Sequence, residues 1–116
     1  MRYYHGTHTD SAVLRRGGSE LDPDVAVALH IDGDHGFYLA DHQDDAEFFA
    51  LRRWSGAVVV YELSQHAVDR LLAAGATHEP IPGGRPPYFQ GQELFVPAAL
   101  FPLFNELLKG GEIDVV

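Results

Sequence analysis

Short apolar segments, separated by glycine, proline and polar residues, recur along the chain and predict strands that alternate with helices. The clearest is Ala57 to Leu63, where a nearly continuous run of β-branched residues predicts a strand that is buried on both sides. The other expected strands are Arg2 to His5, Gly36 to Ala40, Glu93 to Val96 and Ile113 to Val116. The apolar pattern therefore predicts short strands spread over the whole chain.

Helices are expected between these strands, where capping residues precede apolar positions at helical spacing. They cover Asp10 to Arg16, the residues after Asp41, Ser64 to Gly75, and Pro97 to Gly110. Asp41 is expected to cap its helix with a side-chain oxygen, and Asp44 and Asp45 would lie in the first turn. Ser64 is expected to cap the next helix, which Gly75 ends. Two long segments, 19–35 and 76–92, are expected to be loops.

Composition excludes several classes of protein. The chain has 116 residues, which suits a single domain spanning 1–116, and it has no cysteine for disulfides, thiolate nucleophiles or cysteine-based zinc sites. The formal net charge is -9 and the basic residues are scattered, so nucleic acid is not an expected partner. No segment reaches the ~20 apolar residues of a membrane helix, so a soluble, cytoplasmic protein without membrane contact is expected.

Three segments place a polar or aromatic side chain at a strand end beside a glycine, where a backbone can approach a ligand closely. They are Tyr4-His5-Gly6-Thr7, Gly36-Phe37-Tyr38-Leu39-Ala40-Asp41 and Gln92-Glu93-Leu94-Phe95-Val96. In this order and spacing they resemble the His-Tyr-Glu signature of the ADP-ribosyltransferase superfamily, in particular its poly(ADP-ribose) polymerase-like and diphtheria-toxin-like branch. The resemblance spans nearly the whole chain.

The resemblance implies an α+β fold in which two small, roughly perpendicular β-sheets surround an NAD+ cleft and helices pack on the outside. We expect leucine and valine residues from most of the predicted elements in the core. The expected core residues are Val58, Val60, Leu63, Leu71, Leu94, Val96 and Leu107. Val68 and Leu72 are also expected to face inward from the helix after Ser64.

The resemblance also implies roles for individual residues, with NAD+ bound as the substrate. His5 would hydrogen-bond a ribose hydroxyl, and the Gly6 backbone, beside Thr7, would hold the nicotinamide carboxamide. Tyr38 would stack on the nicotinamide ring. Glu93 would accept the 2′-hydroxyl and stabilise positive charge as the glycosidic bond breaks.

A second aromatic residue at Phe49, eleven positions after Tyr38, would complete the nicotinamide sandwich, although a core position explains it equally well. Taken singly, His5 and Tyr38 also fit ordinary structural roles. Two departures from the family pattern matter. Gly91 stands where members that modify arginine or asparagine carry Glu or Gln, and Ala46 stands where a serine or threonine is common. An arginine-directed activity is therefore not expected.

The implied reaction is transfer of a single ADP-ribose unit from NAD+ to a protein or small-molecule acceptor. The small size is typical of a bacterial toxin, for which an antitoxin or immunity protein would be the partner. An NAD+ glycohydrolase, with water as acceptor, and a non-catalytic module that binds NAD+ or ADP-ribose remain alternatives. RNA 2′-phosphotransfer is disfavoured because the sequence offers no basic phosphate pocket.

The segment His30-Ile31-Asp32-Gly33-Asp34-His35, with His42 nearby, is a rival constellation, because imidazole and carboxylate groups at this density can bind a divalent metal. It lacks the fixed ligand positions over twelve residues and the closing glutamate of an EF-hand. Polar loops of this kind are usually solvated, so no metal is expected.

Overall fold

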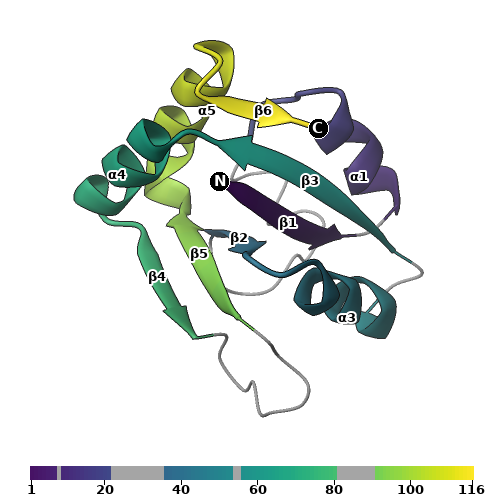
Figure 1. The fold of residues 1–116 in the computed structure, drawn as a ribbon. Coiled ribbons are helices and arrows are strands. Elements are labelled where there is room, and N and C mark those ends of the chain that lie inside the picture. Colours follow the sequence, from purple (N-terminus) through teal and green to yellow (C-terminus); the bar gives the residue numbers. More distant parts are fainter. Residues whose placement is uncertain (8, 22–35, 54–55, 81–90) are drawn as a thin grey trace.

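The computed structural model describes residues 1–7, 9–21, 36–53, 56–80 and 91–116, except for the side chains of 10, 11, 49 and 51–53. Six strands in this part of the chain form one antiparallel sheet in the order β4-β5-β2-β1-β3-β6 (Figure 1). The strands are β1 (Arg2–Thr7), β2 (Gly36–Ala40), β3 (Ala57–Leu63), β4 (Thr77–Pro80), β5 (Gln92–Pro97) and β6 (Ile113–Val115). The strands expected from the apolar pattern are confirmed, with small changes at their ends.

The described helices are α1 (Thr9–Arg16), α3 (Gln43–Arg53), α4 (Gln65–Ala74) and α5 (Phe101–Lys109), with a 3₁₀ turn, η1 (Ala98–Leu100), before α5. Helices α1, α4 and α5 supply buried residues to the main core on one face of the sheet. Helix α3 covers the opposite face near the end of β1 (Figure 1). The α+β class is therefore confirmed. None of these described helices combines the length and apolar composition needed to cross a lipid bilayer.

The sheet is narrowly connected at its centre. Strand β1 pairs with β3 over Arg2 to Thr7, and β2 pairs with β5 over Gly36 to Ala40. Between β1 and β2 the register contains only the pair Tyr4↔Ala40. Instead of the two separate sheets that the sequence led us to expect, the described strands form one continuous sheet whose two well-paired parts meet at this pair.

The main core lies on the sheet face that carries Tyr3 and Tyr61, which are 1% exposed. Five expected core residues are buried there: Leu63, Leu71, Leu94, Val96 and Leu107. Val58 and Val60 are not part of this main core, because successive side chains of a strand point to opposite faces and β3 buries Val59, Tyr61 and Leu63 here. Both are half-buried on the other face, where Val58 packs against the smaller cluster of Ala40 and Ala46. In α4, Val68 is buried as expected, whereas Leu72 is exposed.

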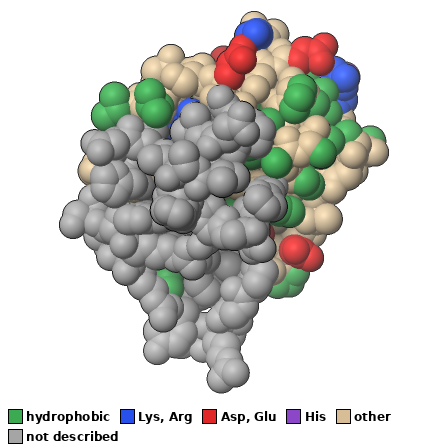
Figure 2. All heavy atoms as spheres, turned by 180° about the vertical axis from the view of Figure 1, so that it is seen from behind, with side chains coloured by type: hydrophobic (Ala, Val, Ile, Leu, Met, Phe, Trp, Pro, Cys, Tyr) green, Lys and Arg blue, Asp and Glu red, His purple; other side chains and the backbone are tan. Residues whose placement is uncertain are grey.

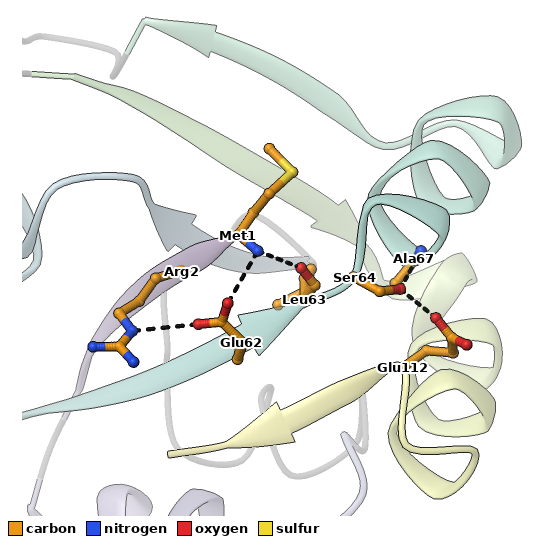
Figure 3. Close-up of polar contacts among 7 residues, drawn as sticks. All are labelled: Met1, Arg2, Glu62, Leu63, Ser64, Ala67 and Glu112. Atoms are coloured by element: carbon orange, nitrogen blue, oxygen red, sulfur yellow. Dashed lines mark hydrogen bonds and ion pairs between the residues drawn. The ribbon is translucent and has the colours of Figure 1, made fainter.

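Helix α4 begins and ends as its capping residues predict. The Ser64 hydroxyl accepts a hydrogen bond from the Ala67 N–H at 3.0 Å, and Gly75 is the C-cap with a φ of 128°. The same hydroxyl donates to the Glu112 carboxylate, next to β6 (Figure 3). Ser64 therefore joins the start of α4 to the residue before β6.

The first residues of β1 are held against the end of β3. The amino group of Met1 donates to the Leu63 carbonyl at 2.6 Å and to the Glu62 carboxylate at 3.2 Å (Figure 3). Arg2 donates to the other oxygen of Glu62 at 3.3 Å. These contacts reinforce the longest ladder of the sheet.

Strand β4 was not expected, because residues 76–92 were predicted to be a loop. Thr77–Pro80 is exposed throughout and pairs with β5, where Thr77 lies opposite Phe95 and Glu79 opposite Glu93. A hydrogen bond of 2.7 Å between His78 Nδ1 and the Gln92 side-chain oxygen adds to this pairing. The described part of the expected loop is therefore an edge strand beside Glu93.

Basic side chains are scattered over the described surface. Those visible on the reverse face in Figure 2 stand apart from one another. Lys109 forms an ion pair with Glu20, and Arg2 forms one with Glu62. The described residues in this view thus form no basic stripe of the kind that follows a nucleic-acid backbone.

Candidate functional site

His5 lies on β1, 8% exposed, and its ring stacks on Phe37 with the centroids 4.0 Å apart. Its Nδ1 lies 2.8 Å from the Tyr38 carbonyl oxygen. Burial lowers the pKa of His5 from 6.5 to about 4, although the hydrogen bond to this carbonyl acts in the opposite direction. At neutral pH the ring is therefore neutral. Nδ1 donates to the carbonyl, so Nε2 is an acceptor that suits a hydroxyl donor.

The backbone of Gly6 faces β2 at the point where the β1–β2 ladder stops. The Leu63 N–H donates to the Met1 carbonyl, so Met1 and every second residue after it direct their backbone groups toward β3. The backbone groups of Tyr4 and Gly6 therefore point toward β2. Tyr4 lies opposite Ala40 in the last β1–β2 pair. The N–H and C=O of Gly6 are thus directed past the end of this ladder.

A glycine is required at position 6 because α3 packs against it. A Cβ atom there would lie 2.1 Å from the Ala46 carbonyl oxygen and 3.2 Å from the Ala50 nitrogen. A side chain at this position would therefore collide with the helix. Ala46 is buried at this contact.

Tyr38 lies on β2, directly opposite Phe95 of β5. Their rings are 4.8 Å apart between centroids at 33°. Gly36 makes room for Phe95, since a Cβ atom on Gly36 would lie 2.1 Å from that ring. Tyr38 is half-buried, and its ring lies on the sheet face opposite Phe37. The aromatic pair is thus built into two adjacent strands.

Glu93 is 4% exposed and lies opposite Ala40 on β2 and Glu79 on β4. It projects from the same sheet face as Tyr38, which is its diagonal neighbour across β2 and β5. Such neighbours are roughly 7–8 Å apart. A buried carboxyl beside an aromatic ring is a candidate for chemistry, because burial and neighbouring charge alter its reactivity.

Residues at the start of α3 hold the beginning of β5. Asp41 Oδ1 accepts the Gln92 N–H at 2.9 Å, and the buried Asp45 accepts the Gly91 N–H at 2.9 Å. Helix α3 begins at Gln43, two residues after Asp41, and the contact of Asp41 with Gln92 joins residues 51 positions apart. Asp44 and Asp45 do lie in the first turn of α3. Together Asp41 and Asp45 fix the chain just before Glu93.

His42 pairs with Asp41, whose Oδ1 is 2.8 Å from His42 Nδ1. A Cβ atom on Gly91 would lie 2.0 Å from this Asp41 oxygen and 2.3 Å from His42 Nδ1. Gly91 is therefore required because the Asp41–His42 pair fills the space of a side chain at position 91. Gly91 and His42 are 49 positions apart, and no local pattern in the sequence links them.

Asp41, His42 and Asp45 also bring three potential metal-ligand atoms within 4.8 Å of one another. Hydrogen bonds to Gly91 and Gln92 account for the two carboxylates, so this geometry does not by itself indicate a metal. The other members of the rival metal constellation, residues 30–35, lie outside the described residues.

The structure connects two of the three signature residues directly and the third through the sheet. His5 contacts the Tyr38 backbone from the core side, while the side chains of Tyr38 and Glu93 share the opposite face. Thr7 is buried on the His5 side of β1, away from that face. The side chain of Phe49 and the whole of Tyr88 and Phe89 lie outside the described residues.

Comparison with known proteins identifies no relative of this chain. No protein-family model, no curated protein and no solved structure matches this chain.

Proposed function

We propose that this chain is a mono-ADP-ribosyltransferase that cleaves the nicotinamide–ribose bond of NAD+ and transfers ADP-ribose to an acceptor. The observation that carries the proposal is the hydrogen bond of 2.8 Å from His5 to the Tyr38 carbonyl, beside the end of the β1–β2 ladder. It ties two signature residues together one strand away from the buried Glu93.

The residues present fit the chemistry of NAD+. A neutral His5 with Nε2 as acceptor suits a ribose hydroxyl, and the N–H and C=O of Gly6 suit the two ends of a carboxamide. The half-buried Tyr38 ring suits a flat, cationic pyridinium. Tyr38 and the Gly6 backbone would hold the nicotinamide ring at the junction of β1 and β2, and a ribose hydroxyl would reach His5 beyond the single Tyr4↔Ala40 pair, where the two strands are no longer paired.

Glu93 is the residue that would act on the bond to be broken. Its carboxylate would accept the 2′-hydroxyl and stabilise the positive charge that develops on the ribose as nicotinamide leaves. Its burial supports this role, because electrostatic stabilisation is stronger where water is excluded. Loss of this charge should reduce nicotinamide release by a factor on the order of 10²–10³.

The test is incubation of the protein with NAD+ radiolabelled in its adenylate half, in the presence of a cell lysate. Nicotinamide release and label on macromolecules or small acceptors are measured for wild type and Glu93→Gln. Glu106→Gln serves as the matched control, since Glu106 is an exposed glutamate of α5. We expect both signals in wild type and Glu106→Gln, and loss of both in Glu93→Gln.

Other results would redirect or reject the proposal. Nicotinamide release with ADP-ribose as the only product would indicate a glycohydrolase. NAD+ binding without nicotinamide release would indicate a binding module. The absence of both binding and release in the wild-type protein would reject an NAD+ site.

A further inference from the structure

The space that a side chain at position 91 would need is filled by Asp41 and His42. An added Cβ atom on Gly91 would lie 2.0 Å from Asp41 Oδ1 and 2.3 Å from His42 Nδ1. Gly91 precedes Glu93 by two residues, and Asp41 is hydrogen-bonded to Gln92, the residue between them. The Asp41–His42 pair therefore stands next to the proposed catalytic carboxylate and takes the place of a residue-91 side chain.

The pair is held in a fixed orientation. Asp41 Oδ1 accepts both the Gln92 N–H at 2.9 Å and His42 Nδ1 at 2.8 Å, so β5 anchors the carboxylate that positions the imidazole. With Nδ1 donating to Asp41, the basic lone pair of the neutral ring is on Nε2. This is the arrangement in which an aspartate orients a histidine that serves as a general base.

His42 is also accessible to an incoming molecule. Its side chain is 53% exposed, whereas that of Asp41 is 32% exposed. The hydrogen bond to Asp41 raises the pKa of His42 above 6.5, and the charges of Asp45 and Asp44 act in the same direction. The adjoining residues, Gly91 and the first residue of β5, Gln92, contribute no titrating group. The surrounding carboxylates therefore make this imidazole a stronger base than a free one.

We propose that His42, positioned by Asp41, is the general base that activates a hydroxyl acceptor for ADP-ribose, an inference that rests on the proposed function. The bond between ribose C1′ and the nicotinamide nitrogen breaks, and its electron pair neutralises the pyridinium. The acceptor oxygen forms a bond to C1′, and its proton passes to Nε2 of His42 and then to solvent. The products are nicotinamide, an O-linked ADP-ribosyl compound and one proton.

The chemistry of the pair selects the acceptor class. An imidazole can remove a proton from an oxygen that becomes acidic as it attacks C1′. It is far too weak a base to deprotonate a guanidinium, whose pKa is above ~12. A hydroxyl group, either of water or of an organic acceptor, is therefore the substrate that this site would activate.

The test uses His42→Asn, because the asparagine amide can still donate to Asp41 while the basic nitrogen is lost. His66→Asn is the matched control, since His66 is an exposed histidine on α4. NAD+ turnover is measured with water alone, with methanol as an organic hydroxyl probe, and with agmatine as a guanidinium probe. ADP-ribose, methyl ADP-riboside and ADP-ribosyl agmatine distinguish the three acceptors.

We expect His42→Asn to lower kcat for the water and methanol products by at least about 10²-fold with little change in the KM for NAD+. The acidic limb of the wild-type kcat–pH profile should disappear in this variant, and added imidazole should restore turnover in His42→Ala. Equal yields of ADP-ribose and methyl ADP-riboside would show that His42 activates both water and organic hydroxyl groups. A large excess of one product would identify the preferred acceptor.

The inference and the proposed function fail in different ways. If Glu93→Gln abolishes nicotinamide release while His42→Asn keeps the wild-type kcat and pH profile, His42 is not the base and the proposed function stands. Preferred modification of agmatine would also overturn the hydroxyl assignment. If wild type releases no nicotinamide, both proposals fall.

Discussion

His5 Nδ1 and the Tyr38 carbonyl oxygen are 2.8 Å apart, and this hydrogen bond joins two strands that otherwise share a single register pair. The His5 side chain of β1 thus takes the place of a backbone N–H as hydrogen-bond donor to β2. Because Nδ1 must donate to a carbonyl, the tautomer of His5 is set by the fold. The pH response of the protein should therefore depend on this residue.

Wild-type stability should fall when the pH is lowered from 6.5 toward 4. His5 binds a proton with a pKa near 6.5 in the unfolded chain and about 4 in the folded protein, so the unfolded state binds more protons in this window. The loss over the whole window is about 3 kcal/mol, and the full stability is present above pH 6.5. Urea unfolding at several pH values measures it.

His5→Asn is the control for this effect, since its amide can still donate to the Tyr38 carbonyl but does not titrate. Its free energy of unfolding should change less between pH 7 and pH 4.5 than that of wild type. An identical pH dependence in the two proteins would contradict the assignment to His5.

Gly6→Ala should destabilise the protein, because the new methyl group would meet the Ala46 carbonyl oxygen at 2.1 Å. Displacement of α3 from β1 should cost about 1–3 kcal/mol, the usual range for overpacking. Gly17→Ala is the matched control, since its nearest contacts would be at 3.5 Å. Thermal unfolding of both variants checks this. Equal melting temperatures would show that α3 can shift away from the new methyl group without loss of stability.

Gly91→Ala should also destabilise the protein, and the loss should depend on Asp41 and His42. In the Asp41→Ala/His42→Ala background the space next to Gly91 is vacated, so the same substitution should cost less. A double-mutant cycle by urea unfolding should give a coupling of about 0.5–3 kcal/mol. Strict additivity would mean that the pair moves aside freely.

The pKa of His42 should lie above 6.5 and should fall in Asp41→Asn. The asparagine oxygen can still accept the Gln92 N–H, while the charge that favours the imidazolium is removed. NMR titration of the His42 ring protons measures this without any substrate. An unchanged titration in Asp41→Asn would show that the neighbouring carboxylates of Asp44 and Asp45 dominate.

Much of the fold could be predicted where the signals are local. Ser64 and Gly75 bound α4 as expected because capping depends on adjacent backbone groups. Val58 and Val60 were expected in the same core as Leu63 because both faces of Ala57–Leu63 are apolar, so alternation alone could not show which face carries the main core. Strand β4 was missed because it is exposed throughout and depends on pairing with β5.

The candidate residues of the site could be proposed from the sequence, but the hydrogen bonds between them could not. The sequence identified His5, Tyr38 and Glu93, yet the contact from Asp41 to Gln92 joins positions 51 residues apart, and no local pattern encodes it. Asp41 was therefore interpreted as a helix cap, the role such a residue has most often before a helix. The sequence marks Gly91 as unusual. The reason for a glycine there is seen only in the structure, where the Asp41–His42 pair fills the space that a side chain would need.

The order of the strands has a consequence for how the chain folds during synthesis. Strand β1 is made first but lies inside the sheet, and its long ladder requires β3, which begins at Ala57. Strand β2 in turn requires β5, which begins at Gln92. Such non-local pairing slows folding, and the early strands stay exposed until their partners emerge from the ribosome. Early chain segments are therefore the part of this protein most in need of a chaperone.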